Sequence, residues 1–245
     1  MASDDRTGSP LPLDPARMIA DARRALFTMV GVMAVVWALQ LVNWLDDYGL
    51  SRDYGVMPQQ IDRLPNVVTA PFLHWNWAHL EANSGPLFVF GFLAAYRGVK
   101  KFLGLTLLVA LTSELTAWIF DKPNSIGVGA SGVVFGYFGY VVLRGLFDRN
   151  LIDTLIGLVL GASYAYMVTG ALPGVAPGIS WAAHLGGLVG GFAGAWIFRD
   201  RGPKPADGKA AALPTRSGAA GSGAPTSGAP GSNAALLKEL DDLGL

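Results

Sequence analysis

The stretch GVGASGVVFG, residues 127–136, places a single serine among small residues at the start of an apolar segment. Ser131 lies between Ala130 and Gly132, and the residues that follow are strongly apolar. An apolar run of this kind is typical of a helix that crosses a membrane. Polar groups in such helices are costly and are functional candidates by default, so the serine needs an explanation.

The composition of the whole chain points to a membrane protein. Hydrophobic residues make up 51% of the 245 residues and charged residues only 15%, against about 25% in typical soluble domains. The mean hydropathy is +0.39. The formal net charge is zero, which gives no indication of nucleic-acid binding. The absence of cysteine excludes disulfides and thiolate metal sites.

Several segments approach the roughly 20 apolar residues that a membrane-spanning helix needs. They lie at about 25–45, 79–97, 103–120, 129–147, 151–169 and 179–198. We therefore expect an all-α polytopic membrane protein with six transmembrane helices in a domain at 25–198. A polar connection, 46–78, separates the first two segments and holds Trp75 and Trp77, which suit a membrane interface.

The two ends of the chain differ from this domain in composition. We expect residues 1–24 to form a disordered cytoplasmic segment. The first 18 are polar and lack the basic and apolar regions of a signal peptide. The low-complexity run GSGAPTSGAPGSNA predicts a flexible cytoplasmic tail at 199–245. Its last residues, 233–245, permit a short amphipathic helix, although a frayed end is favoured.

Basic residues predict the orientation of the helices. With a cytoplasmic N-terminus, the outer loops hold only Arg52, Arg63 and Lys122. All basic residues near the other helix ends then lie inside: Arg17, Arg23, Arg24, Arg97, Lys100, Lys101, Arg144, Arg149, Arg199, Arg201 and Lys204. Both termini are therefore predicted in the cytoplasm, and the plasma membrane is the expected location.

This orientation brings three polar residues to one depth. The second, fourth and sixth segments all run from outside to inside, and His79, Ser131 and His184 lie near their outer ends. His79 and Asn83 are spaced i, i+4 and share one helix face. Taken alone, Ser131 is better explained as a small residue at a helix crossing. The shared depth instead favours a functional cluster that opens to the extracellular side.

The cluster has the chemistry of nucleophilic catalysis. A serine beside a neutral imidazole is a nucleophile with its general base, which assigns these roles to Ser131 and His184. His79, Asn83 and the Ser131 N–H group can stabilise an oxyanion. Small residues let the helices approach within reach. They form ridges on the sixth segment (Gly186, Gly190 and Gly194, and Gly187 and Gly191) and on the fourth (Gly129, Gly132 and Gly136).

Three motifs resemble those of the rhomboid intramembrane serine proteases: HWNWAHLEAN (74–83), GASGVVFGYFGY (129–140) and AHLGGLVGGFAGA (183–195). The resemblance covers about residues 25–198 and implies a rhomboid-like bundle of six transmembrane helices. It implies Ser131 as nucleophile, His184 as base without an acidic third member, and His79 and Asn83 in the oxyanion hole. Gly187 and Gly191 would let the two catalytic helices pack.

The resemblance also implies substrates. The family cleaves transmembrane proteins near the outer end of their helix, and substrates are thought to reach the site past the fifth helix. Two features depart from the family pattern. Phe135 replaces a tyrosine that stacks on the catalytic histidine, and a Trp-Arg pair in the first loop is missing. Neither change removes a catalytic group.

Other interpretations fit less well. A non-catalytic rhomboid-like protein that binds membrane helices is the main alternative, although such relatives usually lack the serine or histidine. A small transporter would favour internal repeats, which are not found. No HExxH motif supports a zinc protease, and only Glu114 lies clearly within a span, where aspartyl chemistry needs two carboxylates.

The remaining polar residues have simpler explanations. His74 is expected to anchor a loop, and Glu114 to make a structural hydrogen bond inside the bundle. No metal or organic cofactor is implied, and the partners expected are the lipid bilayer and transmembrane protein substrates. The sequence leaves the oligomeric state open.

Overall fold

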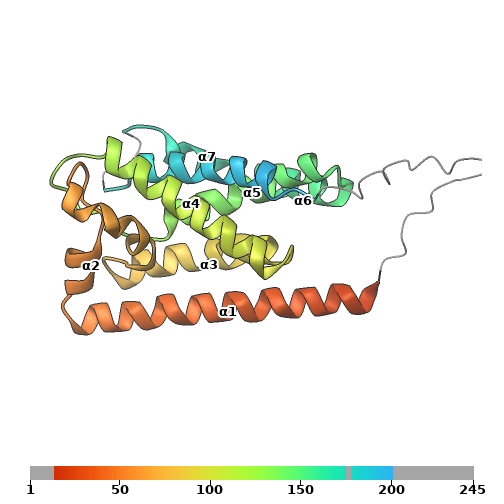
Figure 1. Ribbon diagram of the computed structural model, residues 1–245, viewed down its shortest axis with the longest axis horizontal. Helices are drawn as coiled ribbons and strands as arrows, with labels where there is room; N and C mark the ends of the chain where they lie inside the picture. Colours follow the sequence, from red (N-terminus) through yellow and green to blue (C-terminus); the bar gives the residue numbers. More distant parts are fainter. Residues whose placement is uncertain (1–13, 175–177, 201–245) are drawn as a thin grey trace, which may run out of the picture. The chain divides into compact units, whose positions relative to one another are not determined.

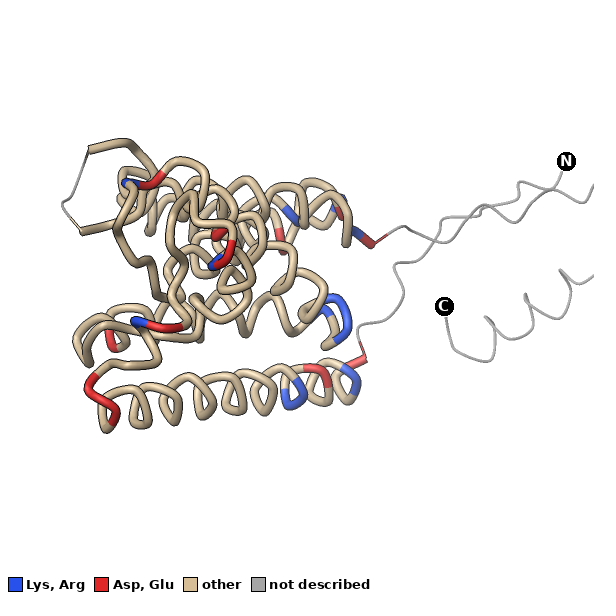
Figure 2. Tube along the Cα trace, turned by 60° about the vertical axis from the view of Figure 1, so that its left-hand side comes forward, with Lys and Arg blue, Asp and Glu red and all other residues tan. Residues whose placement is uncertain are grey.

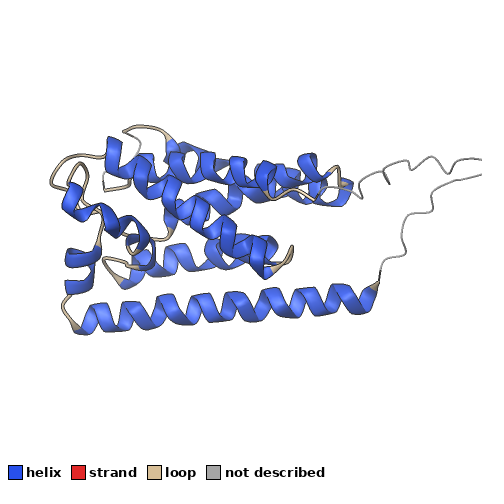
Figure 3. Ribbon diagram, in the orientation of Figure 1, coloured by secondary structure: helices blue, strands red, loops and turns tan. Residues whose placement is uncertain are grey.

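The computed structural model describes residues 14–174 and 178–200, and these residues are almost entirely helical (Figure 3). Within them the only strand-like pairing is an antiparallel bridge between Val56 and Gly127. The α-helices are α1 (Pro15–Leu45), α2 (Gly49–Tyr54), α3 (Trp77–Ala95), α4 (Val99–Phe120), α5 (Ser131–Asp148), α6 (Leu151–Ser163) and α7 (Trp181–Ile197). Three 3-10 helices complete the list: η1 (Ile61–Val68), η2 (Ala70–Phe72) and η3 (Ala165–Ala171).

Two of these helices, α1 and α4, are long and apolar enough by themselves to cross a membrane. The pair α6 and η3 also qualifies as one broken span, bent by 66°. The helices α3, α5 and α7 are shorter, with 19, 18 and 17 residues. The chain is thus an all-α polytopic membrane protein, and the number of six spans stays a prediction.

Helix α1 begins earlier than the apolar pattern suggested. Residues 15–24, which we expected in a disordered segment, form the first turns of this helix. The Asp14 side chain accepts hydrogen bonds from the N–H groups of Ala16 and Arg17, and Pro15 occupies the first turn. An N-cap carboxylate and an early proline both favour a helix start, and neither depends on hydrophobicity. The predictions for residues 1–13 and 201–245 lie outside the described residues.

The polar connection between α1 and α3 is folded rather than extended. It contains α2, η1 and η2, which lie together at one end of the bundle (Figure 1). The buried amide of Asn43 donates to the Ser51 hydroxyl at 2.8 Å and to the His74 carbonyl at 2.9 Å. The end of α1 therefore fixes both α2 and the segment that leads into α3.

Helix α5 forms the centre of the bundle. Most of its residues are buried, and it packs against α7, α6, α3 and α4. The core around it is aromatic, with Phe90 of α3 and Phe102 of α4 fully buried near Phe138 and Tyr137. Helix α1 packs mainly on α3 and lies at the edge of the bundle (Figure 1). The helix that starts with Ser131 is thus held from several sides.

Charged residues gather at the opposite end of these helices, where Figure 2 shows several of them together. Arg144 of α5 donates to the Leu93 carbonyl at 2.9 Å and to Asp153 of α6 at 2.7 Å. Arg97 pairs with Asp153 as well, and with Asp200 at 3.4 Å. Residue 200, expected in a flexible tail, is therefore joined to the bundle by ion pairs that hydropathy cannot reveal.

Candidate active site

The Ser131 hydroxyl and the His184 ring lie in hydrogen-bond contact. Ser131 is the first residue of α5, and His184 lies in the first turn of α7. Their Oγ and Nε2 atoms are 2.9 Å apart, and His184 Nδ1 lies 2.9 Å from the carbonyl oxygen of Gly170. A carbonyl only accepts, so Nδ1 carries the proton and Nε2 is left to accept from the serine. This is the tautomer that a general base requires.

Glycines make this contact possible. A side-chain carbon added at Gly187 would overlap the carbonyl oxygen of Gly132, and one added at Gly191 would overlap that of Gly136. The backbones of α5 and α7 therefore touch along two successive turns. Helices approach this closely only where side chains are absent. The glycines expected to pack the two helices are brought together as a continuous seam beside Ser131.

The segment before Ser131 is held in place by backbone hydrogen bonds. Gly127 exchanges two bonds of 2.9 Å with Val56, and the Gly129 N–H donates to the Ala70 carbonyl at 3.0 Å. Gly129 has φ of +131°, a conformation that favours glycine, and a side chain there would meet the His79 ring. This glycine thus lets the chain turn into α5 directly beside His79.

His79 and Asn83 face the same cavity as the serine and histidine. The cavity has a volume of about 420 Å³ and is lined by all four residues. The Asn83 amide donates one hydrogen bond to the His79 carbonyl at 3.0 Å, which leaves its second N–H free to serve a ligand. The first intrahelical bond of α5 runs from the Val134 N–H to Ala130. The Ser131 N–H, like the other first-turn amides, has no acceptor within the helix.

Phe135 lies flat on the His184 ring. The two ring centres are 4.0 Å apart and the planes differ by 10°. The stacking expected at this position is present without a hydroxyl group. Together with Gly170, Phe135 restricts the imidazole to one plane.

His74 packs against the residues that form the site. It is fully buried, packs edge-on against the His79 ring at 5.0 Å, and accepts from the Ala130 N–H at 3.4 Å. Burial and the neighbouring His79 lower the pKa of His74 to about 3, so it is neutral at physiological pH. His74, which we expected to anchor a loop, therefore contacts both His79 and the residue that precedes Ser131.

Two carboxyl groups also line the cavity. Glu114 of α4 is buried and accepts from the Ser113 hydroxyl at 3.3 Å, which agrees with the structural hydrogen bond expected for it. That hydroxyl lies against Gly132, next to the serine. Asp121 follows α4, and burial raises its pKa although a bond from Ser180 opposes the shift. Two carboxyl groups thus border the cavity besides the Ser131–His184 pair.

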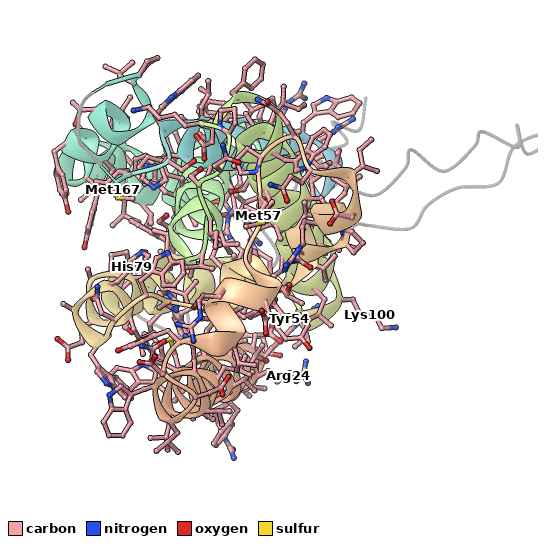
Figure 4. The ribbon with its side chains drawn as sticks, turned by 90° about the vertical axis from the view of Figure 1, so that its left-hand side faces the viewer. Arg24, Tyr54, Met57, His79, Lys100 and Met167 are labelled. Atoms are coloured by element: carbon pink, nitrogen blue, oxygen red, sulfur yellow. The ribbon has the colours of Figure 1, made fainter. Side chains whose placement is uncertain are left out.

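Sequence reasoning missed the Gly170 carbonyl. It lies in η3, and no side chain marks it. Within residues 14–174 and 178–200, no three histidine or acidic side chains lie together in a group that could hold a metal ion. Figure 4 views the molecule from the end that carries the site and labels His79 on α3.

Similarity to known proteins identifies the family of this chain. A model of the Rhomboid domain matches residues 62–201, which include every residue of the cavity. The chain belongs to the rhomboid family. An uncharacterized protein of Mycobacterium tuberculosis is 35% identical to this rhomboid over 178 residues, which cover 70% of this chain and 74% of the relative.

Two further relatives carry rhomboid names. Rhomboid-like protein 11, chloroplastic, of Arabidopsis thaliana is 32% identical over 143 residues, 54% of this chain and 51% of that protein. Rhomboid protease GluP of Bacillus subtilis is 28% identical over 134 residues, 51% of this chain and 24% of GluP. The relatives thus include both a named protease and proteins without an assigned activity.

Proposed function

We propose that this rhomboid is an intramembrane serine endopeptidase that cleaves peptide bonds in or near transmembrane segments of other proteins. The contact between Ser131 and His184 carries the proposal, because the second ring nitrogen is already bonded to a carbonyl and leaves Nε2 as the base. Membership of the rhomboid family, which includes a named protease, supports the same activity.

The reaction follows from the geometry. As the Ser131 oxygen attacks the substrate carbonyl carbon, His184 Nε2 takes the hydroxyl proton and an oxyanion forms. His79, Asn83 and the Ser131 N–H stabilise this oxyanion, and each such donor typically contributes on the order of 3 kcal/mol. The peptide C–N bond then breaks while His184 protonates the departing amine. Water, activated by the same imidazole, hydrolyses the ester and restores the serine.

The Gly170 carbonyl takes the part that an aspartate plays in a catalytic triad. It fixes the orientation and tautomer of His184, and it stabilises the imidazolium less than a carboxylate would, because it carries only a partial charge. Because a backbone carbonyl orients the histidine, the site needs no buried aspartate carboxylate close to the lipid. The three-residue arrangement is therefore complete without an acidic member.

The substrates and location of the protein form part of the proposal. A site built on helix starts in a membrane protein suits a substrate that is itself a transmembrane helix, cleaved near its outer end. We place the protein in the plasma membrane with both termini in the cytoplasm and the cavity open to the extracellular side. Substrates reach Ser131 past α6 and η3, because η3 borders the dyad at the Gly170 carbonyl and only Gly157 and Ala171 of these two elements are buried.

The test compares the wild-type protein with Ser131→Ala in proteoliposomes that contain a single-pass model substrate. We expect the substitution to lower cleavage by at least about 10³-fold, because it removes the nucleophile. A fluorophosphonate probe should label the wild type and fail to label His184→Ala. Ser163→Ala is the matched control, since this exposed serine ends α6 and does not line the cavity.

Undiminished cleavage by Ser131→Ala would refute the proposal. Specific binding of helices by the wild type, with neither cleavage nor labelling, would instead establish the non-catalytic binding protein.

A further inference from the structure

A cavity lined by basic residues lies at the end of the bundle where α1 begins and α3 turns into α4. It has a volume of about 410 Å³, and a second cavity of about 470 Å³ adjoins it through the shared residues Arg24 and Val99. Side chains from both sides of the turn and from α1 line the first cavity: Asp21, Arg24, Tyr96, Arg97, Lys100 and Lys101. We call these two cavities the basic pocket.

The charges of the basic pocket are only partly neutralised. Within residues 14–174 and 178–200, Arg23 and Lys100 have no ion-pair partner, and Arg24 pairs only with Asp21 at 3.1 Å. The Arg24 side chain is 70% exposed, and such surface pairs are weak. Arg97 and Lys101 are engaged by acidic residues of the bundle. The pocket therefore keeps an excess of positive charge contributed by Arg23, Arg24 and Lys100.

The start of α4 adds hydrogen-bond donors to this charge. Gly98 precedes the helix and provides no side-chain cap, and the first intrahelical bond runs from Phe102 N–H to its carbonyl. The first-turn amides thus lack intrahelical acceptors and carry the positive end of the helix dipole. A side chain added at Gly98 would meet nothing within 4 Å, so the space over this turn is open.

Apolar side chains continue from the basic pocket along both helices. On α1, Arg23 is followed by Phe27 and Val30, which are 66% and 50% exposed. On α4, Val99 is followed at i+4 and i+8 by Leu103 and Leu107, which are 57% and 55% exposed. Spacings of three, four and eight keep residues on one helix face. Each helix thus offers cations at its end and apolar surface beside them.

We propose that the basic pocket binds the headgroup of an anionic glycerophospholipid, whose acyl chains lie along these faces of α1 and α4. The phosphodiester accepts hydrogen bonds from Arg23, Arg24, Lys100 and the first amides of α4. The apolar faces beside these cations favour a ligand with acyl chains over a small soluble anion. Arg24 and Lys100 lie on the same side of the bundle in Figure 4, and the basic stretches of α1 and the α3–α4 turn adjoin in Figure 2.

This site is independent of proteolysis, because it lies at the opposite end of α4 from the cavity with Glu114. Helix α1 otherwise packs mainly on α3, so a bound lipid gives α1 a second contact within the bundle. The lipid would act as a wedge between the ends of α1 and α4.

The test uses full-length protein in detergent and measures retention of phosphatidylglycerol against phosphatidylcholine with the same acyl chains by native mass spectrometry. We expect phosphatidylglycerol to bind at least tenfold more tightly. Each basic residue near an anionic headgroup contributes roughly fivefold, so the triple variant Arg23→Gln/Arg24→Gln/Lys100→Gln should lose tenfold or more. The control Lys122→Gln/Arg149→Gln/Arg199→Gln removes equal charge elsewhere and should change binding less than twofold.

Three results would overturn the proposal. Equal retention of the two lipids shows that the headgroup charge is not recognised. Equal losses in both triple variants show that net charge alone attracts the lipid. Displacement of the lipid by millimolar glycerol phosphate shows a site for soluble anions that does not need acyl chains. Unfolding midpoints of all variants, measured in the same detergent, separate loss of binding from loss of fold.

Discussion

The pair α5 and α7 and the arm formed by α6 and η3 differ in how tightly they pack. In the pair, glycines bring two backbones into contact over successive turns. In the arm, a side chain added at Gly157 would lie 2.6 Å from the Val142 carbonyl oxygen, but one at Gly161 would lie 3.6 Å from Val142. The arm therefore packs more closely on α5 at Gly157 than at Gly161, and it bends by 66° into η3.

His184 lies between these two regions. Its backbone belongs to the tightly packed pair, while its Nδ1 atom bonds to Gly170 on the arm. Leu158 and Val159 of the arm are 67% and 63% exposed, only Gly157 and Ala171 of its residues are buried, and Asp153 anchors its start to Arg144. Elements with few buried contacts open most easily. The comparison suggests a rigid frame for the dyad and a movable side for the substrate.

The largest effect is expected from Gly187→Val, which breaks the rigid side. The added side chain collides with the Gly132 carbonyl and must separate α5 from α7. We expect cleavage of the model substrate to fall by more than 10³-fold and stability to fall by about 3 kcal/mol. Gly85→Ala is the control, because a side chain there meets nothing within 4 Å. Equal activity of both variants would contradict the close packing.

The next effect is expected from Asp153→Asn, which releases the arm at its anchor. Asp153 bonds to Arg144, whose side chain is only 7% exposed, and it also pairs with Arg97. Both arginines keep other partners, so we expect a loss of about 2 kcal/mol, below the usual cost of breaking a buried pair. The unfolding midpoint in detergent measures it. Asp21→Asn, which breaks an exposed pair, should cost less than about 0.5 kcal/mol.

Gly170→Ala tests the link between the arm and the histidine. The added carbon would lie 3.2 Å from Phe135 Cζ and 3.3 Å from His184 Nδ1, so η3 must shift by a few tenths of an ångström. A longer bond to Nδ1 orients the base less well, and we expect kcat to fall about tenfold. Single-turnover cleavage measures this step. Unchanged kcat with an altered KM would mean that η3 serves substrate access alone.

The smallest effect is expected from Phe135→Tyr. The ring keeps its stacking on His184, and the new hydroxyl can point into a cavity of about 290 Å³ between Phe135 and the arm. We expect cleavage rates within about threefold of the wild type, whereas Phe135→Ala removes the stacking and should cost about tenfold. A large loss in the tyrosine variant would show that the arm closes tightly over this ring.

The sequence alone determined the kind of protein and the chemistry available to it. Hydropathy and low charge predicted an all-α membrane protein, and both the fold class and the rhomboid family are confirmed. The roles of Ser131, His184, His79 and Asn83 stay predictions, although the four residues line one cavity. Their common depth was predictable because apolar segments fix where each helix starts.

Only the tertiary structure decided how the site is held. The Gly170 carbonyl orients His184, yet every residue has a carbonyl and no sequence pattern marks this one. The bend between α6 and η3 falls within a continuous apolar run, and the Arg144–Asp153 ion pair joins two helices through charges that hydropathy counts as unfavourable. Composition and periodicity report what a segment prefers by itself, whereas these features depend on which distant backbone atoms and charges packing brings together.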